Sequence, residues 1–146
     1  MALRKKSGQF FGDVQADIRP GLLFYSEKAG YPAEHYADAR CGCGESRFRL
    51  ELDEDQGVAV RICAACAVRH IMADGSEYLE NAELQTCSCT CEADVFEITV
   101  GVALYEDSED VRWLYVGCRC VSCGLLGCYG DWKNEFQGYK ELLSRV

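Results

Sequence analysis

The sequence lacks the features that would place this protein in a membrane or outside the cell. No apolar run approaches the ~20 residues that are needed to cross a bilayer. The basic start at residues 4–6 is followed by Ser, Gly, Gln and Asp, where a secretory signal would have an apolar stretch. Only two prolines occur and 49% of the residues are apolar, which argues against disorder. We therefore expect a folded, soluble protein in the cytoplasm.

Familiar catalytic motifs are also missing. The sequence has no H-E-x-x-H, no G-x-S-x-G and no glycine-rich phosphate loop. It contains two histidines, His35 and His70, and neither lies in the H-x-E pattern of the zinc deaminases. We therefore expect a protein that is not an enzyme.

Positive charge is scarce. The chain has 24 acidic and 15 basic side chains, for a net charge of −9, which disfavours binding to nucleic-acid backbones and to anionic membranes. The acidic residues cluster in two predicted turns, at Asp53, Glu54 and Asp55 and at Glu106, Asp107, Glu109 and Asp110. These clusters are either solvated turns or a docking surface for a basic protein, whose approach complementary charge would steer.

Cysteine, by contrast, is abundant. In a chain without an export signal, eleven cysteines indicate metal ligation rather than disulfides. Two segments share the order C-x-C, spacer, C-x-x-C, with spacers of 19 and 28 residues. Alignment of these two repeats also places Phe48 on Phe96 and Asp74 on Asp131. The agreement extends beyond the cysteines and indicates an internal duplication.

Each spacer has the pattern of a β-hairpin. Apolar residues alternate with polar or small ones over 48–62 around the turn DEDQG, and over 95–118 around EDSED. A hairpin leaves and returns at the same end, so it brings each C-x-C pair beside its C-x-x-C pair. The longer second spacer predicts longer strands or a bulge at Gly101.

Four thiolates from two such pairs suit a tetrahedral zinc ion, with iron or an iron–sulfur cluster as the alternative. The predicted ligands are Cys41, Cys43, Cys63 and Cys66 for one ion and Cys89, Cys91, Cys120 and Cys123 for the other. The pattern resembles zinc-ribbon modules over residues 40–75 and 88–132, although the C-x-C pairs depart from the usual ribbon spacing. The resemblance implies a structural zinc ion in each repeat.

Three cysteines remain outside these sets: Cys87, Cys118 and Cys128. Cys128 aligns with Ile71, which favours a buried apolar thiol. Cys87 lies two residues before Cys89, so its replacement of Cys89 or Cys91 as a ligand stays open. His70 and Cys128 are further candidate ligands, but the residue aligned with His70 is a glycine.

We expect a mainly β protein with minor α content, in which two zinc-ribbon-like hairpin repeats pack together. An N-terminal extension, 1–39, packs on the core and contains a strand at 22–25. The first repeat covers 40–86, with a short helix at 76–83. The second covers 87–146 and ends in an amphipathic helix, because apolar residues at 139, 142, 143 and 146 have helical spacing.

These features favour a non-enzymatic, zinc-binding protein-interaction module, whose specific form would be an inhibitor or immunity-type antagonist of a basic toxin or nuclease. A nucleic-acid-associated zinc-ribbon factor is the alternative, with Arg47, Arg49 and Arg61 along one strand face. A thiol-redox or metal-handling protein is the third hypothesis.

Overall fold

The computed structural model describes residues 3–146. Its α-helices and β-strands, in chain order, are β1 (Arg4–Lys6), β2 (Gln9–Phe11), α1 (Ile18–Ala29), β3 (His35–Asp38), β4 (Phe48–Asp53), β5 (Val58–Cys63), β6 (Arg69–Ile71), β7 (Gln85–Thr86), β8 (Phe96–Leu104), β9 (Val111–Cys120), β10 (Leu126–Lys133) and α2 (Tyr139–Leu143). The mainly β fold with minor α content is confirmed. Within residues 3–146, no helix is both long and apolar enough to span a membrane.

Each repeat forms an antiparallel hairpin followed by a third strand. The first consists of β4, β5 and β6, and the second of β8, β9 and β10. The strands follow the order β10-β9-β8-β4-β5-β6 in one sheet, and β1 and β2 form a separate two-stranded sheet. Both predicted hairpins are thus present, and each metal-ligand end lies opposite its acidic turn.

The two repeats meet through equivalent residues. β4 pairs with β8 at a single position, where Phe48 lies opposite Phe96. Phe48 is also paired with Cys63 within its hairpin, as Phe96 is with Cys120. Pairing between equivalent residues of an antiparallel ladder indicates a local two-fold relation between the repeats.

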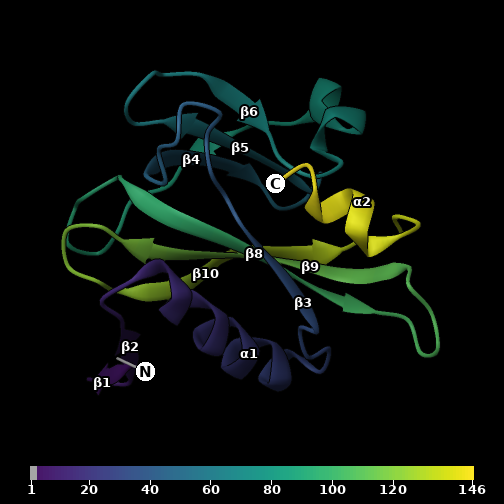
Figure 1. The fold of residues 1–146 in the computed structure, drawn as a ribbon, viewed down its shortest axis with the longest axis horizontal. Coiled ribbons are helices and arrows are strands. Elements are labelled where there is room, and N and C mark those ends of the chain that lie inside the picture. Colours follow the sequence, from purple (N-terminus) through teal and green to yellow (C-terminus); the bar gives the residue numbers. More distant parts are fainter. Residues whose placement is uncertain (1–2) are drawn as a thin grey trace.

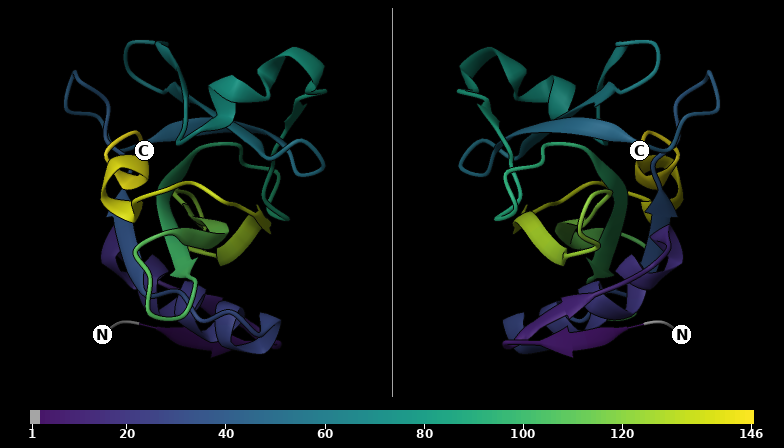
Figure 2. Two further views of the ribbon diagram at one scale, coloured as in Figure 1. Left: turned by 90° about the vertical axis from the view of Figure 1, so that its right-hand side faces the viewer. Right: turned by 90° about the vertical axis from the view of Figure 1, so that its left-hand side faces the viewer.

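The main core lies between the two repeats. In Figure 1, β8, β9 and β10 occupy the middle of the molecule, with β4, β5 and β6 above them and α1 below. Side chains of β9 alternate between the two sides of the sheet, as the strand period requires. Leu114 and Val116 join the main core, whereas Tyr115 packs with Ile18 and Leu22 of α1 in a second cluster. Figure 2 shows β1 and β2 beside α1, at the opposite end from β6.

The predicted strand at 22–25 is wrong, because these residues lie inside α1. Ile18, Leu22 and Ser26 are buried on one face of this helix, at intervals of four residues. Pro20 falls in the first turn. N–H groups there have no partner within the helix, so the proline costs no helical hydrogen bond. Gly30 ends the helix in the left-handed conformation, with φ 96°.

Three smaller expectations also differ from the structure. The region 76–83 forms two short 3₁₀ turns, Gly75–Glu77 and Leu79–Asn81, instead of one helix. The irregularity in β8 falls between Ala103 and Leu104 instead of at Gly101. A Cβ at Gly101 would stand 3.1 Å from the ring of Tyr36. The glycine therefore lets β3 pack closely on β8 and does not form a bulge. The C-terminal helix is shorter than expected, although Leu142 and Val146 are both buried.

Candidate metal centres

Two tight turns hold the first set of cysteines. In the first turn, the Cys41 N–H donates to the carbonyl of Glu45 (2.9 Å) and the Gly44 N–H to that of Cys41 (2.8 Å). In the second, the Cys63 N–H donates to the carbonyl of Val68 (3.0 Å) and the Ala67 N–H to that of Cys63 (3.0 Å). These bonds fold the backbone so that both cysteines of each pair face the same point.

The second repeat reproduces this geometry bond for bond. The Cys89 N–H donates to the carbonyl of Ala93 (2.7 Å), and the Cys120 N–H donates to that of Leu125 (2.9 Å). All four turns place a residue in the left-handed region, at Gly44, Ala67, Glu92 and Gly124. Two of these are not glycine, so the turns accept strain to position the thiols. The duplication therefore extends to the backbone of the sites.

The sulfur positions fit a tetrahedral metal ion. In each set, the four Sγ atoms lie within 4.8 Å of one another. The Cys41–Cys66 and Cys43–Cys63 Sγ distances are both 3.6 Å. The Cys89–Cys123 and Cys91–Cys120 distances are also 3.6 Å. A tetrahedral ion with ligands at about 2.3 Å needs sulfur atoms about 3.8 Å apart. The structure therefore brings together both predicted sets, and each can hold one ion.

Each centre has a buried and a more exposed side. The first cysteine of every turn is buried: Cys41, Cys63, Cys89 and Cys120. The second cysteine of each pair lies at the surface. A bound ion would thus be anchored in the core and remain within reach of solvent on its outer side.

The backbone favours thiolates at both centres. The N–H groups of Cys66 and Ala65 both point at the Cys63 Sγ, at 3.4 Å. Led by the bond from Cys66, they lower the pKa of Cys63 to about 6. At Cys89, burial opposes ionisation, but the N–H of Cys91 and the neighbouring thiols lower its pKa to about 7. Against opposing backbone N–H bonds, thiol–thiol hydrogen bonds raise the pKa of Cys43 and Cys66, and burial raises that of Cys120 and Cys123. Because metals bind the thiolate, Cys63 and Cys89 are the thiols that ionise first, one in each set.

Arg61 supports the first centre from inside the core. Its Nε donates to the carbonyl of Val146 (2.8 Å), and its guanidinium lies 4.7 Å from the ring centre of Phe48. Its positive charge acts on the thiolates of Cys41 and Cys63. Arg61 therefore does not share a solvent face with Arg47 and Arg49, because it lies opposite Leu50 and points inward with it.

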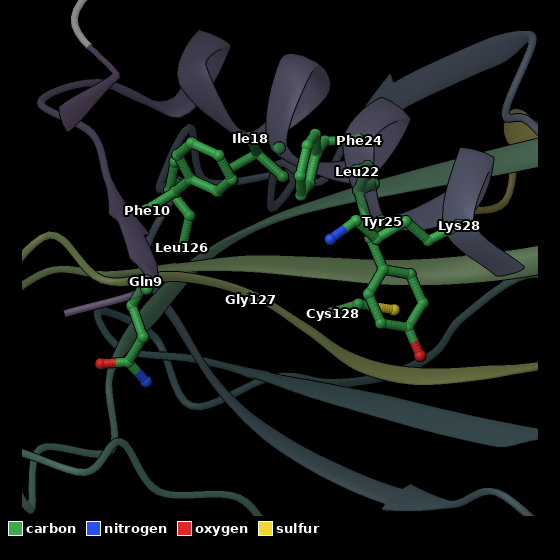
Figure 3. A pocket seen from close by; sticks show the side chains of 12 residues that line it. Gln9, Phe10, Ile18, Leu22, Phe24, Tyr25, Lys28, Leu126, Gly127 and Cys128 are labelled. Atoms are coloured by element: carbon green, nitrogen blue, oxygen red, sulfur yellow. The ribbon is translucent and has the colours of Figure 1, made fainter. Parts of the chain in front are cut away.

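The other candidate ligands lie outside both sets. The His70 Nε2 contacts the carbonyl of Arg145 at 2.7 Å. Cys118 is fully buried in the main core, and Cys87 packs against its edge. Cys128 lines a small apolar cavity of about 300 Å³ between β2, α1 and β10, where Figure 3 shows it beside Tyr25. Burial raises the pKa of Cys118 and Cys128, and that of Cys87 to about 11, so these thiols stay protonated at neutral pH.

The sequence did not indicate a further group of polar and aromatic residues at the far end of the hairpins. Trp113, Asp131, Trp132 and Asn134 meet the turn after β4 there, around a larger cavity. The alignment of Asp74 with Asp131 was the one signal for it.

Comparison of the chain with protein-family models, curated proteins and solved structures gave no match.

Proposed function

We propose that this protein is a non-enzymatic interaction module, held in shape by two structural zinc ions, that binds a basic protein. The observation that carries the proposal is the pair of four-thiol sites, one at the base of each hairpin. Cys41, Cys43, Cys63 and Cys66 would hold one ion and Cys89, Cys91, Cys120 and Cys123 the other. Zinc with four thiolates cross-links the chain and keeps no open position for a catalytic water.

The zinc-ribbon resemblance is supported by the arrangement of these sites. In both repeats, the cysteine turns flank a hairpin and are drawn together at its base. Four thiolates suit zinc and iron alike, so zinc is favoured on the zinc-ribbon resemblance and elemental analysis distinguishes the two. A reducing compartment such as the cytoplasm would keep the eight thiols available for the metal.

The surface charge supports a basic partner. Glu54, Asp55, Glu106 and Asp107 stand at the acidic turns, away from the metal centres. Asp53 and Asp110 are tied to the fold by shorter bonds, because their carboxylates accept backbone N–H groups from Glu83 (2.8 Å) and Gly138 (3.1 Å), whereas the Glu54 carboxylate accepts one from Asp131 at 3.3 Å. The docking role therefore falls to the five other carboxylates, those of Glu54, Asp55, Glu106, Asp107 and Glu109. An inhibitor or immunity-type antagonist of a basic toxin or nuclease is the form that we favour.

The nucleic-acid alternative is disfavoured by the arginines. Arg47 forms an ion pair with Glu45 (2.7 Å) and Arg49 with Asp94 (3.4 Å), while Arg61 is buried. The three do not form a basic stripe. A redox role is disfavoured because each C-x-x-C thiol pair lies 3.6 Å from C-x-C partners, in the geometry of ligation.

Two measurements test the proposal. Elemental analysis should find two zinc ions per chain after gentle purification, and a folded protein without metal would contradict it. The second measurement is a pull-down, in which the immobilised protein captures its partners from an extract of its native host. Capture should weaken with added salt and with the variant Glu54→Gln/Asp55→Asn/Glu106→Gln/Asp107→Asn. Glu27→Gln/Glu80→Gln, at exposed positions outside the turns, is the control. Binding of nucleic acid in place of protein would favour the alternative.

A further inference from the structure

The two equivalent aspartates of the repeats, Asp74 and Asp131, line the same cavity. This acidic cavity has a volume of about 650 Å³ and lies where the turn after β4 meets the end of β10. Its walls carry five carboxylates, from Glu54, Asp55, Asp74, Asp131 and Glu135. The one basic side chain that lines it, Lys133, pairs with Glu135 at 3.1 Å. The cavity is of a size that holds a small ligand or a side chain.

The other four carboxylates have neutral partners only. Among residues 3–146, no ion pair involves Glu54, Asp55, Asp74 or Asp131. Asp74 accepts from the amide of Asn134 (3.2 and 3.1 Å), and Asp131 accepts from the indole N–H of Trp113 (2.9 Å). Apart from the longer-range charge of Arg145 on Asp74, neutral donors orient these carboxylates without balancing their charge. The concave wall therefore concentrates negative potential, which attracts a cation.

The spacing of the carboxylates argues against a metal ion. Within the described part of the chain, only the two cysteine sets bring three or more candidate ligand atoms within 4.8 Å of one another. The carboxylates around the acidic cavity are therefore too dispersed for one small ion. A larger cation with several N–H donors, such as a guanidinium, fits this spread better.

Aromatic side chains complete the cavity and add a second requirement. Tyr78, Trp113 and Trp132 line it, and aromatic faces favour flat cations. Trp132 is 9% exposed, and its Nε1 is a buried donor without a hydrogen-bond partner. Gly57 lies against this edge of the ring, where a Cβ would stand 3.2 Å from Nε1. This unsatisfied N–H is closed to solvent, so an acceptor such as a peptide carbonyl reaches it only where the turn at Gly57 moves aside.

We propose that the acidic cavity binds an arginine side chain of a basic polypeptide. The guanidinium pairs with Glu54, Asp55 and the inner aspartates, and its flat face packs on the aromatic rings. A carbonyl of the same peptide accepts the N–H of Trp132. This inference rests on the proposed function and specifies where the basic partner docks and which side chain it inserts.

The fluorescence of the chain offers a direct test, because its only two tryptophans both line the acidic cavity. The zinc-loaded protein is titrated with the tripeptide Gly-Arg-Gly, blocked at both ends, and with the same peptide carrying neutral citrulline. The arginine peptide should change the emission saturably, and the citrulline peptide should bind at least tenfold more weakly. Equal responses to the two peptides, or none, would overturn the proposal.

A matched pair of variants locates the binding. Glu54→Gln/Asp55→Asn removes two charges from the cavity, and Glu106→Gln/Asp107→Asn removes the same two charge units from the other acidic turn. We expect the first variant to weaken binding of the arginine peptide by about tenfold, since two exposed charge pairs are lost. The second variant should change the affinity for this peptide less than twofold. Equal weakening in both variants would show a general charge effect and overturn the assignment.

Trp132→Phe tests the carbonyl contact by calorimetry. Removal of the N–H should weaken binding of the blocked peptide by roughly threefold to tenfold. The affinity for methylguanidinium, which has no carbonyl, should not change. Equal loss for both probes would overturn the N–H contact.

These results separate this inference from the proposed function. If the chain captures a partner in a salt-dependent way that Glu106→Gln/Asp107→Asn abolishes and Glu54→Gln/Asp55→Asn does not, the cavity assignment fails and the interaction role stands. If the arginine peptide binds but no basic protein is captured, the interaction role fails.

Discussion

The two repeats carry the same metal-site backbone in different surroundings. The second repeat has strands of 9 and 10 residues, covered by α1 on one side and by the main core on the other. The first has strands of 6 residues each, and Arg49 and Glu51 of β4 line its outer side, where they pair with Asp94 and Arg69. Equivalent metal sites thus anchor a long hairpin that is packed on both sides and a shorter hairpin whose first strand keeps a polar outer side.

This difference indicates how the stability of each repeat is divided between metal and core. A structural zinc ion contributes to folding most where the apolar core is smallest. We therefore expect the first repeat to depend on its ion for its fold, whereas the second retains its central strands when its ion is lost.

The strongest test of this contrast removes one ligand from each centre. Structural zinc contributes about 10–16 kcal/mol in small domains, as much as the whole stability of a typical protein. Cys63→Ser should therefore unfold β4 and β5 and leave β9 protected, whereas Cys120→Ser should lower the melting temperature but keep the β8–β9 pairing. Hydrogen exchange with metal analysis measures both.

The matched control for this test is Cys128→Ser, which lies outside the predicted ligand sets. It should keep both ions and lose only a buried apolar contact. If Cys120→Ser unfolds the whole chain while Cys63→Ser leaves the first hairpin protected, the proposed division of stability is reversed.

A second test disturbs the cover that α1 gives to the second repeat. A Cβ at Gly117 would stand 2.6 Å from the Leu22 Cγ and 2.7 Å from the Ile18 Cγ2, so Gly117→Ala must push the helix away. We expect a loss of about 1–3 kcal/mol in the free energy of unfolding, measured in urea.

The control is Gly21→Ala on the facing helix. There, the nearest atom to the new Cβ is the Leu126 Cδ1, at an ordinary 3.7 Å. Because alanine favours the helix over glycine, this variant should gain up to about 1 kcal/mol. A loss of stability in both variants would show that any added methyl group between α1 and the sheet is destabilising, and that the close approach at Gly117 is not the cause.

The smallest expected effect compares the equivalent aspartates. Burial raises the pKa of Asp74 above its unfolded value, so its charge destabilises the fold once the pH exceeds the folded pKa. Asp74→Asn should therefore gain up to about 1 kcal/mol at pH 7 and nothing below about pH 3, where the carboxyl is protonated in both states.

Asp131→Asn should behave in the opposite way. Asp131 accepts from Trp113 through Oδ2 (2.9 Å) and from Tyr25 through Oδ1 (3.3 Å), and an asparagine amide keeps only one acceptor. We expect a loss of about 1 kcal/mol at pH 7. Urea unfolding at pH 7 and at low pH measures the stability of both variants. A change of the same sign in the free energy of unfolding of both variants at pH 7 would contradict the environments assigned to the two aspartates.

The cysteine spacing predicted both metal-site sets because ligand pairs and hairpins are local features. The helix over 18–29 was missed because Leu22 to Tyr25 read as an apolar strand, although residues 18, 22 and 26 share one helical face. Apart from the alignment of Asp74 with Asp131, the sequence did not indicate the acidic cavity, because the cavity depends on how the turn after β4 lies against the end of β10. Arg61 was misplaced for a similar reason, since only the β4–β5 register shows that it points inward.

The pairing of Phe48 with Phe96 has a consequence for how such a chain could arise. A contact between identical positions is the isologous interface of a symmetric homodimer, in which each subunit offers the same patch to the other. A single ancestral repeat could have assembled with its own copy through this position. Joining the copies in one polypeptide makes the encounter intramolecular and independent of protein concentration. It also frees each half to diverge, so that the second repeat could be covered by α1 of the N-terminal segment while the first contributed its turn to a cavity.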